Sequence, residues 1–137
     1  MKKKIILSIV ALVIVAVIGT WYYVFIYSKT HHRNVANEKA IAISAKQIVN
    51  DFQVNESAAD AKYLNKAVEV TGEVAETKTD QVGNITVTLK GGDAFASVFC
   101  TLKPGSTQPV VGKNISIKGI CNGFLSDVVL NECIITQ

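Results

Sequence analysis

The hydrophobic positions follow three patterns along the chain. Residues 5–27 form a stretch without a charged side chain. Over 38–52 the apolar residues recur every three or four positions, which is typical of one face of a helix. After Asn65 apolar and polar residues alternate, as they do in half-buried strands. This order predicts an apolar N-terminal helix, a helical lead-in over 38–64 and a β domain over 65–137.

The lead-in contains two predicted helices. The first carries an apolar stripe that includes Ile41, Ala45 and Phe52. The second begins after Asn55, a residue type that caps helix N-termini, and Glu56 favours the positive end of the helix dipole.

Five runs of alternating residues follow, separated by turn signals such as Gly83-Asn84 and Gly91-Gly92-Asp93. The runs cover 68–74, 85–89, 95–102, 115–121 and 128–135. Five short strands after a helical lead-in predict a mainly β (α+β) chain with a five-stranded OB-like barrel. Periodicity alone leaves OB, SH3-like and sandwich topologies open.

Two sets of residues add a family resemblance. The first set is Asn55-Glu56, Ala59, Lys62-Tyr63, Lys66, Val70-Thr71-Gly72 and Val74. The second set is Gly112-Lys113, Ile117-Lys118-Gly119, Cys121, Gly123-Phe124, Val129-Leu130 and Cys133. In order and spacing they resemble the tRNA-anticodon-like OB-fold family of bacterial exported proteins, over about residues 50–135. Asn65 stands where that family often has Gly. The resemblance implies an OB barrel behind a membrane or lipid anchor, and it implies no established activity.

The apolar N-terminal stretch has the length of a membrane span. A helix over 5–27 covers roughly 34 Å, against about 30 Å for a bilayer core. Trp21, Tyr22 and Tyr23 lie at one end, where an aromatic belt meets the lipid headgroups. A cleaved signal peptide is the alternative, but its apolar region is shorter and ends in small residues. We therefore predict an uncleaved signal anchor over 1–27.

The charge distribution assigns an orientation to this anchor. The formal net charge is +3, and Lys2, Lys3 and Lys4 account for all of it, because the residues from Ser28 onward are formally neutral. The positive-inside rule then favours the N-terminus in the cytoplasm. We predict a single-pass protein of the cytoplasmic (inner) membrane whose C-terminal domain is periplasmic or extracytoplasmic.

Residues 28–37 are polar and are interpreted as a juxtamembrane linker. His31 and His32 lie in it, and a metal site there is disfavoured because the chain has no further histidine.

The predicted barrel lacks the residues of common catalytic sites. No histidine follows His32, which removes Ser-His and Cys-His catalysis from the barrel unless the linker folds back on it. No phosphate-binding loop or dinucleotide fingerprint occurs. We therefore expect no enzyme activity, no cofactor and no metal.

Three cysteines lie in the barrel region: Cys100, Cys121 and Cys133. In an oxidising compartment a disulfide is expected. Cys121 and Cys133 flank a hairpin centred near Asp127, which favours a structural disulfide between them. Cys100–Cys133 is the rival pairing, and three small buried thiols are the remaining alternative.

OB folds bind ligands through their second and third strands. On these strands the candidate ligand face consists of Thr86, Thr88, Lys90, Phe95 and Phe99. If the two phenylalanines point outward they form a stacking platform. Two phenylalanines in a small barrel are more often core residues, so we expect them inside.

These features predict a membrane-anchored, non-enzymatic OB-fold binding module. Protein, peptide and glycan are the expected partner classes, besides the membrane itself. The alternative is a domain that binds single-stranded nucleic acid or oligonucleotides. The absence of a basic excess in the barrel region makes nucleic acid a less favoured partner.

Overall fold

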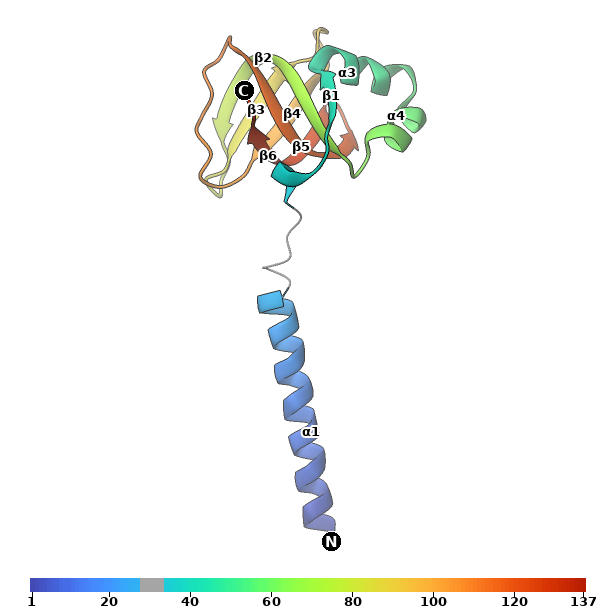
Figure 1. Cartoon of the computed structure of the whole chain (residues 1–137), viewed down its shortest axis with the longest axis vertical. Helices are drawn as coiled ribbons and strands as arrows, with labels where there is room; N and C mark the ends of the chain where they lie inside the picture. Colours follow the sequence, from blue (N-terminus) through green and yellow to red (C-terminus); the bar gives the residue numbers. More distant parts are fainter. Residues whose placement is uncertain (28–33) are drawn as a thin grey trace. The chain divides into compact units, whose positions relative to one another are not determined.

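The computed structural model describes residues 1–27 and 34–137 of the chain (Figure 1). The chain divides into two compact units, Met1–Asn34 and Val35–Gln137.

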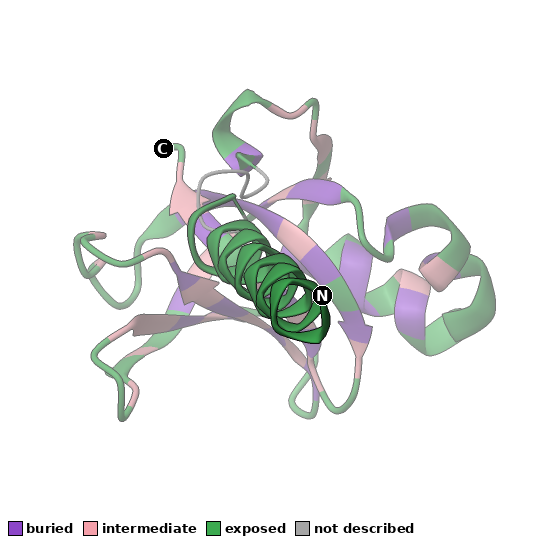
Figure 2. Cartoon of the chain, turned by 90° about the horizontal axis from the view of Figure 1, so that it is seen from below, coloured by how far each residue is buried: buried purple, intermediate pink, exposed green. Residues whose placement is uncertain are grey.

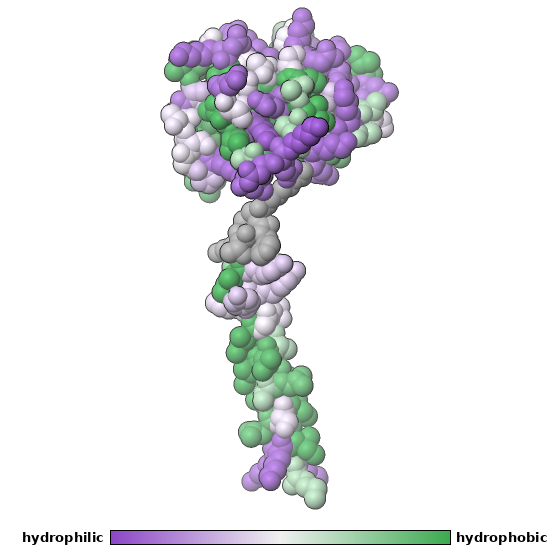
Figure 3. Space-filling view, in the orientation of Figure 1, coloured by the Kyte–Doolittle hydropathy of each residue, from purple (hydrophilic) through white to green (hydrophobic). Residues whose placement is uncertain are grey.

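The N-terminal unit is a helix without a core. Helix α1 spans Lys2–Tyr22 and continues as one π-helical turn, η1, over Tyr23–Tyr27. None of its residues is buried (Figure 2). Hydrophobic residues cover most of α1, and hydrophilic residues lie at its N-terminal end (Figure 3). A helix of this length and composition fits a membrane span, and it equally fits a signal sequence.

The lead-in starts with a strand that the sequence pattern did not predict. After the 3-10 turn η2 (Val35–Asn37), strand β1 (Ile41–Ser44) pairs in parallel with the start of β2 (Ala67–Thr79). The helix expected over 38–52 therefore begins only at α3 (Ala45–Val54). The Ser44 side chain accepts a hydrogen bond from the Gln47 amide at 3.1 Å and caps α3.

The second helix, α4, spans Glu56–Tyr63. The Asn55 side chain accepts a hydrogen bond from the Ala58 amide at 3.1 Å, so the predicted cap is confirmed.

Five strands close into the barrel and confirm the predicted OB-like, mainly β fold. After β2 they are β3 (Ile85–Lys90), β4 (Ser97–Leu102), β5 (Asn114–Phe124) and β6 (Val128–Ile135). The strand order is β1-β2-β3-β4-β6-β5, and the additional β2–β5 pairing closes the barrel. Only β4 and β6 pair in parallel within it.

The core combines the inward side chains of the barrel with one face of α3 and α4 (Figure 2). Phe52 stacks on Phe124 at 5.8 Å between ring centroids and lies 6.0 Å from Tyr63. Phe52 and Tyr63 are the largest side chains that the two helices add to the core, and Phe124 belongs to β5.

The segment that leads into the barrel is fixed to its wall. Val35 is fully buried, although the sequence analysis placed it in the linker over 28–37. The Lys118 side chain, on β5, donates hydrogen bonds to the carbonyl oxygens of Ala36, at 3.1 Å, and of Glu38. We call residues 35–38 the strap. His31 and His32 lie outside the described residues.

The predicted disulfide is wrong. Cys100, Cys121 and Cys133 are all free and buried. The hairpin is tighter than the sequence analysis assumed, since Cys121 lies opposite Leu130 and not opposite Cys133. Cys133 instead pairs with Leu102 of β4.

The three thiols should be unreactive in the folded protein. Hydrogen bonding with Cys133 and burial raise the pKa of the Cys100 thiol well above its usual range, and burial raises the pKa of Cys121. We expect no alkylation by iodoacetamide under native conditions. After denaturation without reductant all three thiols should be modified, as mass spectrometry of the intact chain would show. A thiol that still requires reduction would indicate a disulfide.

Candidate functional site

The outward side of β3, β4 and β6 forms a continuous surface, which we call the outer face. Alternation sends Val87, Leu89 and Cys100 into the core and their neighbours outward. On this face Thr88 lies opposite Phe99, and Phe99 lies opposite Val129. The outer face consists of Thr86, Thr88, Lys90, Ser97, Phe99, Thr101, Asp127, Val129 and Asn131.

Both candidate phenylalanines are outside the core, which corrects the expectation that they point inward. Phe99 is half-buried on the outer face. Strand β4 starts at Ser97, so Phe95 belongs to the β3–β4 loop, where 89% of it is exposed. The structure thus brings Thr86, Thr88, Lys90 and Phe99 together and places Phe95 at one end of them. The two rings do not form one stacking platform.

The lysines around the outer face are paired with carboxylates. Lys90 lies 2.5 Å from Glu73, and Lys78 on β2 lies 2.9 Å from Glu76. Exposed pairs of this kind add little stability, but they offset the positive charge that a phosphate would need. The unit Val35–Gln137 holds nine lysines, no arginine and eleven acidic residues, a formal charge of −2.

Two loops meet at the end of the outer face. The Ser97 amide and hydroxyl both donate to Oδ1 of Asp127, at 2.8 and 2.7 Å. These bonds tie the first residue of β4, directly after the β3–β4 loop, to the β5–β6 loop. Asp93 accepts hydrogen bonds from the Phe95 amide and the Gln53 side chain, both at 3.0 Å, so α3 holds the β3–β4 loop.

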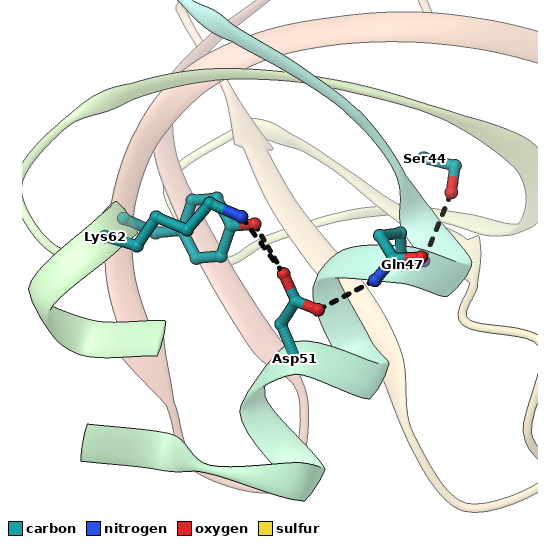
Figure 4. Close-up of polar contacts among 5 residues, drawn as sticks. Ser44, Gln47, Asp51 and Lys62 are labelled. Atoms are coloured by element: carbon teal, nitrogen blue, oxygen red, sulfur yellow. Dashed lines mark hydrogen bonds and ion pairs between the residues drawn. The ribbon is translucent and has the colours of Figure 1, made fainter. Parts of the chain in front are cut away.

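A second polar cluster joins the two helices of the lead-in (Figure 4). Asp51 on α3 accepts hydrogen bonds from the Tyr63 hydroxyl at 2.6 Å and the Gln47 amide nitrogen at 2.8 Å. The Lys62 side chain lies 3.5 Å from Asp51. Because the Asp51 carboxylate accepts hydrogen bonds from side chains of both helices, we infer that this cluster fixes the orientation of α4 relative to α3.

Asp51 should make folding stability depend on pH. The hydrogen bond from Tyr63 lowers the pKa of Asp51, so its stabilising effect is present above the unfolded pKa. That stability should be lost as the pH falls from about 4 through the folded pKa. Asp51→Asn should flatten this acid limb in guanidinium titrations between pH 2 and pH 7. A Glu56→Gln control, on the exposed side of α4, should keep it.

Tyr63 should make folding stability depend on pH in the alkaline range. Burial and the Asp51 hydrogen bond raise the pKa of Tyr63. Its contribution to stability is therefore present below the unfolded pKa and is lost as the pH rises through the folded value.

No three His, Cys, Asp or Glu side chains gather as a metal site within 1–27 and 34–137.

The whole-chain comparison decides the family. The model of the tRNA_anti-like family matches residues 1–135. The chain belongs to the tRNA_anti-like family. The match confirms the resemblance that was seen over about 50–135, and it extends to the apolar helix. No curated protein matches the sequence.

Among the solved structures that match, we describe one that shares the fold of this tRNA_anti-like chain. It is a Klebsiella pneumoniae protein called "putative nucleic acid-binding lipoprotein", with a TM-score of 0.57 and 14% sequence identity. The alignment covers 70% of this chain and 92% of the Klebsiella chain. At this identity the likeness concerns the fold alone.

Sequence reasoning missed the part of the outer face that β6 supplies in this tRNA_anti-like barrel. The alternation over 128–135 marks Val129 as outward, but the parallel pairing of β4 with β6 joins residues 30 positions apart. Asp127 was seen only as the centre of a hairpin. Its hydrogen bonds to Ser97 depend on that pairing, which no local pattern encodes.

Proposed function

We propose that the protein is a membrane-anchored, non-enzymatic module that binds a partner through the outer face on the extracytoplasmic side. The observation that carries the binding role is the outer face itself. It presents the half-buried Phe99 and a row of hydroxyl groups on the strands through which OB folds bind ligands.

Three observations support anchoring by α1. The helix has no buried residue, starts with three lysines and is apolar beyond them. The tRNA_anti-like match includes it. The Klebsiella protein of the same fold is called a lipoprotein, which is another way of holding such a barrel at a membrane.

Cysteine labelling tests the anchor and its orientation. Because the three native thiols are buried, a membrane-impermeant maleimide should react only with an introduced cysteine. In intact spheroplasts we expect Ser57→Cys, on the exposed side of α4, to be labelled and Lys3→Cys to be protected. Labelling of Lys3→Cys alone would reverse the orientation. Release of the chain by carbonate, or loss of its first residues, would contradict the anchor.

Single-stranded nucleic acid is the second candidate ligand. The printed name of the Klebsiella protein favours it. The charge of −2 on the barrel unit and the paired Lys78 and Lys90 oppose it. A fluorescent dodecamer of deoxythymidine should therefore show no salt-dependent binding to the chain in nanodiscs. Binding that weakens steeply with salt and is lost in Phe99→Ala would make nucleic acid the ligand.

A further inference from the structure

Two rows of outward side chains run beside each other along β4 and β6. The strands are parallel, with Val98 opposite Val128 and Phe99 opposite Val129. The hydrogen bonds from Ser97 to Asp127 continue this alignment beyond the first pair. Phe95 and Leu125 each lie three positions before the Val98–Val128 pair, in the loops that precede β4 and β6, so both loops lie at the same end of the barrel.

These two residues have the most exposed large apolar side chains of the barrel unit. Phe95 is 89% exposed and Leu125 is 87% exposed. Their loops are held by hydrogen bonds, from the Phe95 amide to Asp93 and from the Leu125 amide to the Asp127 carbonyl. Apolar side chains on a fixed backbone bind a partner with a smaller loss of conformational entropy than those on a mobile loop.

A carboxylate lies between the exposed apolar pair and the half-buried Phe99–Val129 pair. Asp127 is half-buried, and both of its hydrogen bonds from Ser97 reach Oδ1. Lys90, which lies opposite Ser97, has its own carboxylate partner in Glu73. Each row therefore has apolar, polar and apolar residues at every second position of the sequence, and the β6 row carries the negative charge of Asp127 in its middle.

This spacing matches one kind of ligand. An extended peptide places every second side chain on the same face, about 7 Å apart, which is also the step from Ser97 to Phe99 along β4. We propose that the outer face binds an extended segment of a partner protein in which two apolar residues flank a Lys or Arg at every second position. The apolar residues contact the Phe95–Leu125 and Phe99–Val129 pairs, and the cation contacts Asp127. The inference rests on the proposed use of the outer face for binding.

The test uses the full chain in nanodiscs and fluorescein-labelled heptapeptides. The probe is Ser-Phe-Ser-Lys-Ser-Phe-Ser, and its first control, Phe-Phe-Lys-Ser-Ser-Ser-Ser, has the same composition without the spacing. A second control replaces Lys by Glu. In fluorescence anisotropy we expect the probe to bind at least about tenfold more tightly than either control.

Variants locate the binding on the outer face. Asp127→Asn keeps an oxygen that can accept from Ser97 but replaces the other carboxylate oxygen by an NH2 group and removes the charge, so it should weaken binding of the probe about fivefold. Phe95→Ser and Leu125→Ser should each weaken it about three- to tenfold. Val82→Ser is the matched control, because Val82 is 84% exposed on the β2–β3 turn, at the other end of β3. Its affinity should not change.

Four results would overturn the inference. Equal binding of the probe and the reordered peptide would show that the spacing of the Phe and Lys residues in the peptide does not affect binding. An unchanged affinity in Asp127→Asn would remove the role of the charge. Binding of the deoxythymidine dodecamer but not of the probe, lost in Phe99→Ala, would overturn the peptide inference and keep the binding role of the outer face. A folded chain that binds neither the heptapeptide probe nor the dodecamer would contradict both the peptide inference and the proposed binding role of the outer face.

Discussion

Tyr63→Ala should come close to unfolding the barrel unit. Tyr63 is fully buried between α4 and the core, packs against Phe52 and donates a hydrogen bond to Asp51. Truncation of a buried aromatic side chain costs about 3–5 kcal/mol, and a domain of this size has roughly 5–10 kcal/mol in total. Guanidinium unfolding followed by far-UV circular dichroism measures the loss.

Tyr63→Phe separates packing from hydrogen bonding in the same position. It keeps the ring and removes the hydroxyl group that contacts Asp51, so the expected loss is about 1–2 kcal/mol. If the two substitutions cost the same, the hydrogen bond rather than the packed ring would dominate the role of Tyr63.

The second large effect is expected at Gly119 on β5. A Cβ atom there would lie 2.4 Å from the Cys133 sulfur and 3.1 Å from the Asn131 carbonyl oxygen. Gly119→Ala should therefore destabilise the fold by about 2–3 kcal/mol, since the barrel wall cannot move far enough to accept a methyl group. The free energy of unfolding in guanidinium measures the effect.

A double-mutant cycle identifies the sulfur as the cause. Cys133→Ala alone removes a buried sulfur atom and should cost about 1–2 kcal/mol. Combined with Gly119→Ala it should cost at least about 1 kcal/mol less than the sum of the two, because the methyl group then meets no sulfur. Strict additivity would place the strain at Asn131 instead.

Local patterns predicted most of the fold. The alternation over 128–135 coincides with β6, and the Asn55 cap was visible in the sequence. Asn65 has a φ of +60°, which explains why an Asn stands where the family often has Gly. Strand β1 was missed because Ile41 fits both a helical stripe and a period of two. Four residues are too few to decide between them.

The pairing of residues across strands could not be predicted in the same way. The disulfide prediction assumed a hairpin centred on Asp127, with Cys121 opposite Cys133. The register instead shifts between Cys121 and Phe124 and again between Lys118 and Ile120. Glu132 lies on β6 at the second of these shifts, between Asn131 and Ile134, the partners of Ile120 and Lys118. Its φ is +55°, as an irregular strand position allows. Such shifts leave no mark on hydrophobic alternation, so the cysteine positions required the structure.

The strap gives the barrel a defined point of attachment. Val35 is buried, and Lys118 holds the carbonyl groups of Ala36 and Glu38, so the chain is fastened to β5 before it enters β1. A pulling force on Asn34, such as one from a membrane-embedded helix, would act first on the contacts of Val35 and on the hydrogen bonds of Lys118. The hydrogen bonds between β1 and β2 would bear tension only after the strap had peeled away. Lys118→Met should therefore lower the first rupture force in an optical-tweezers experiment and leave the main unfolding force of the barrel unchanged.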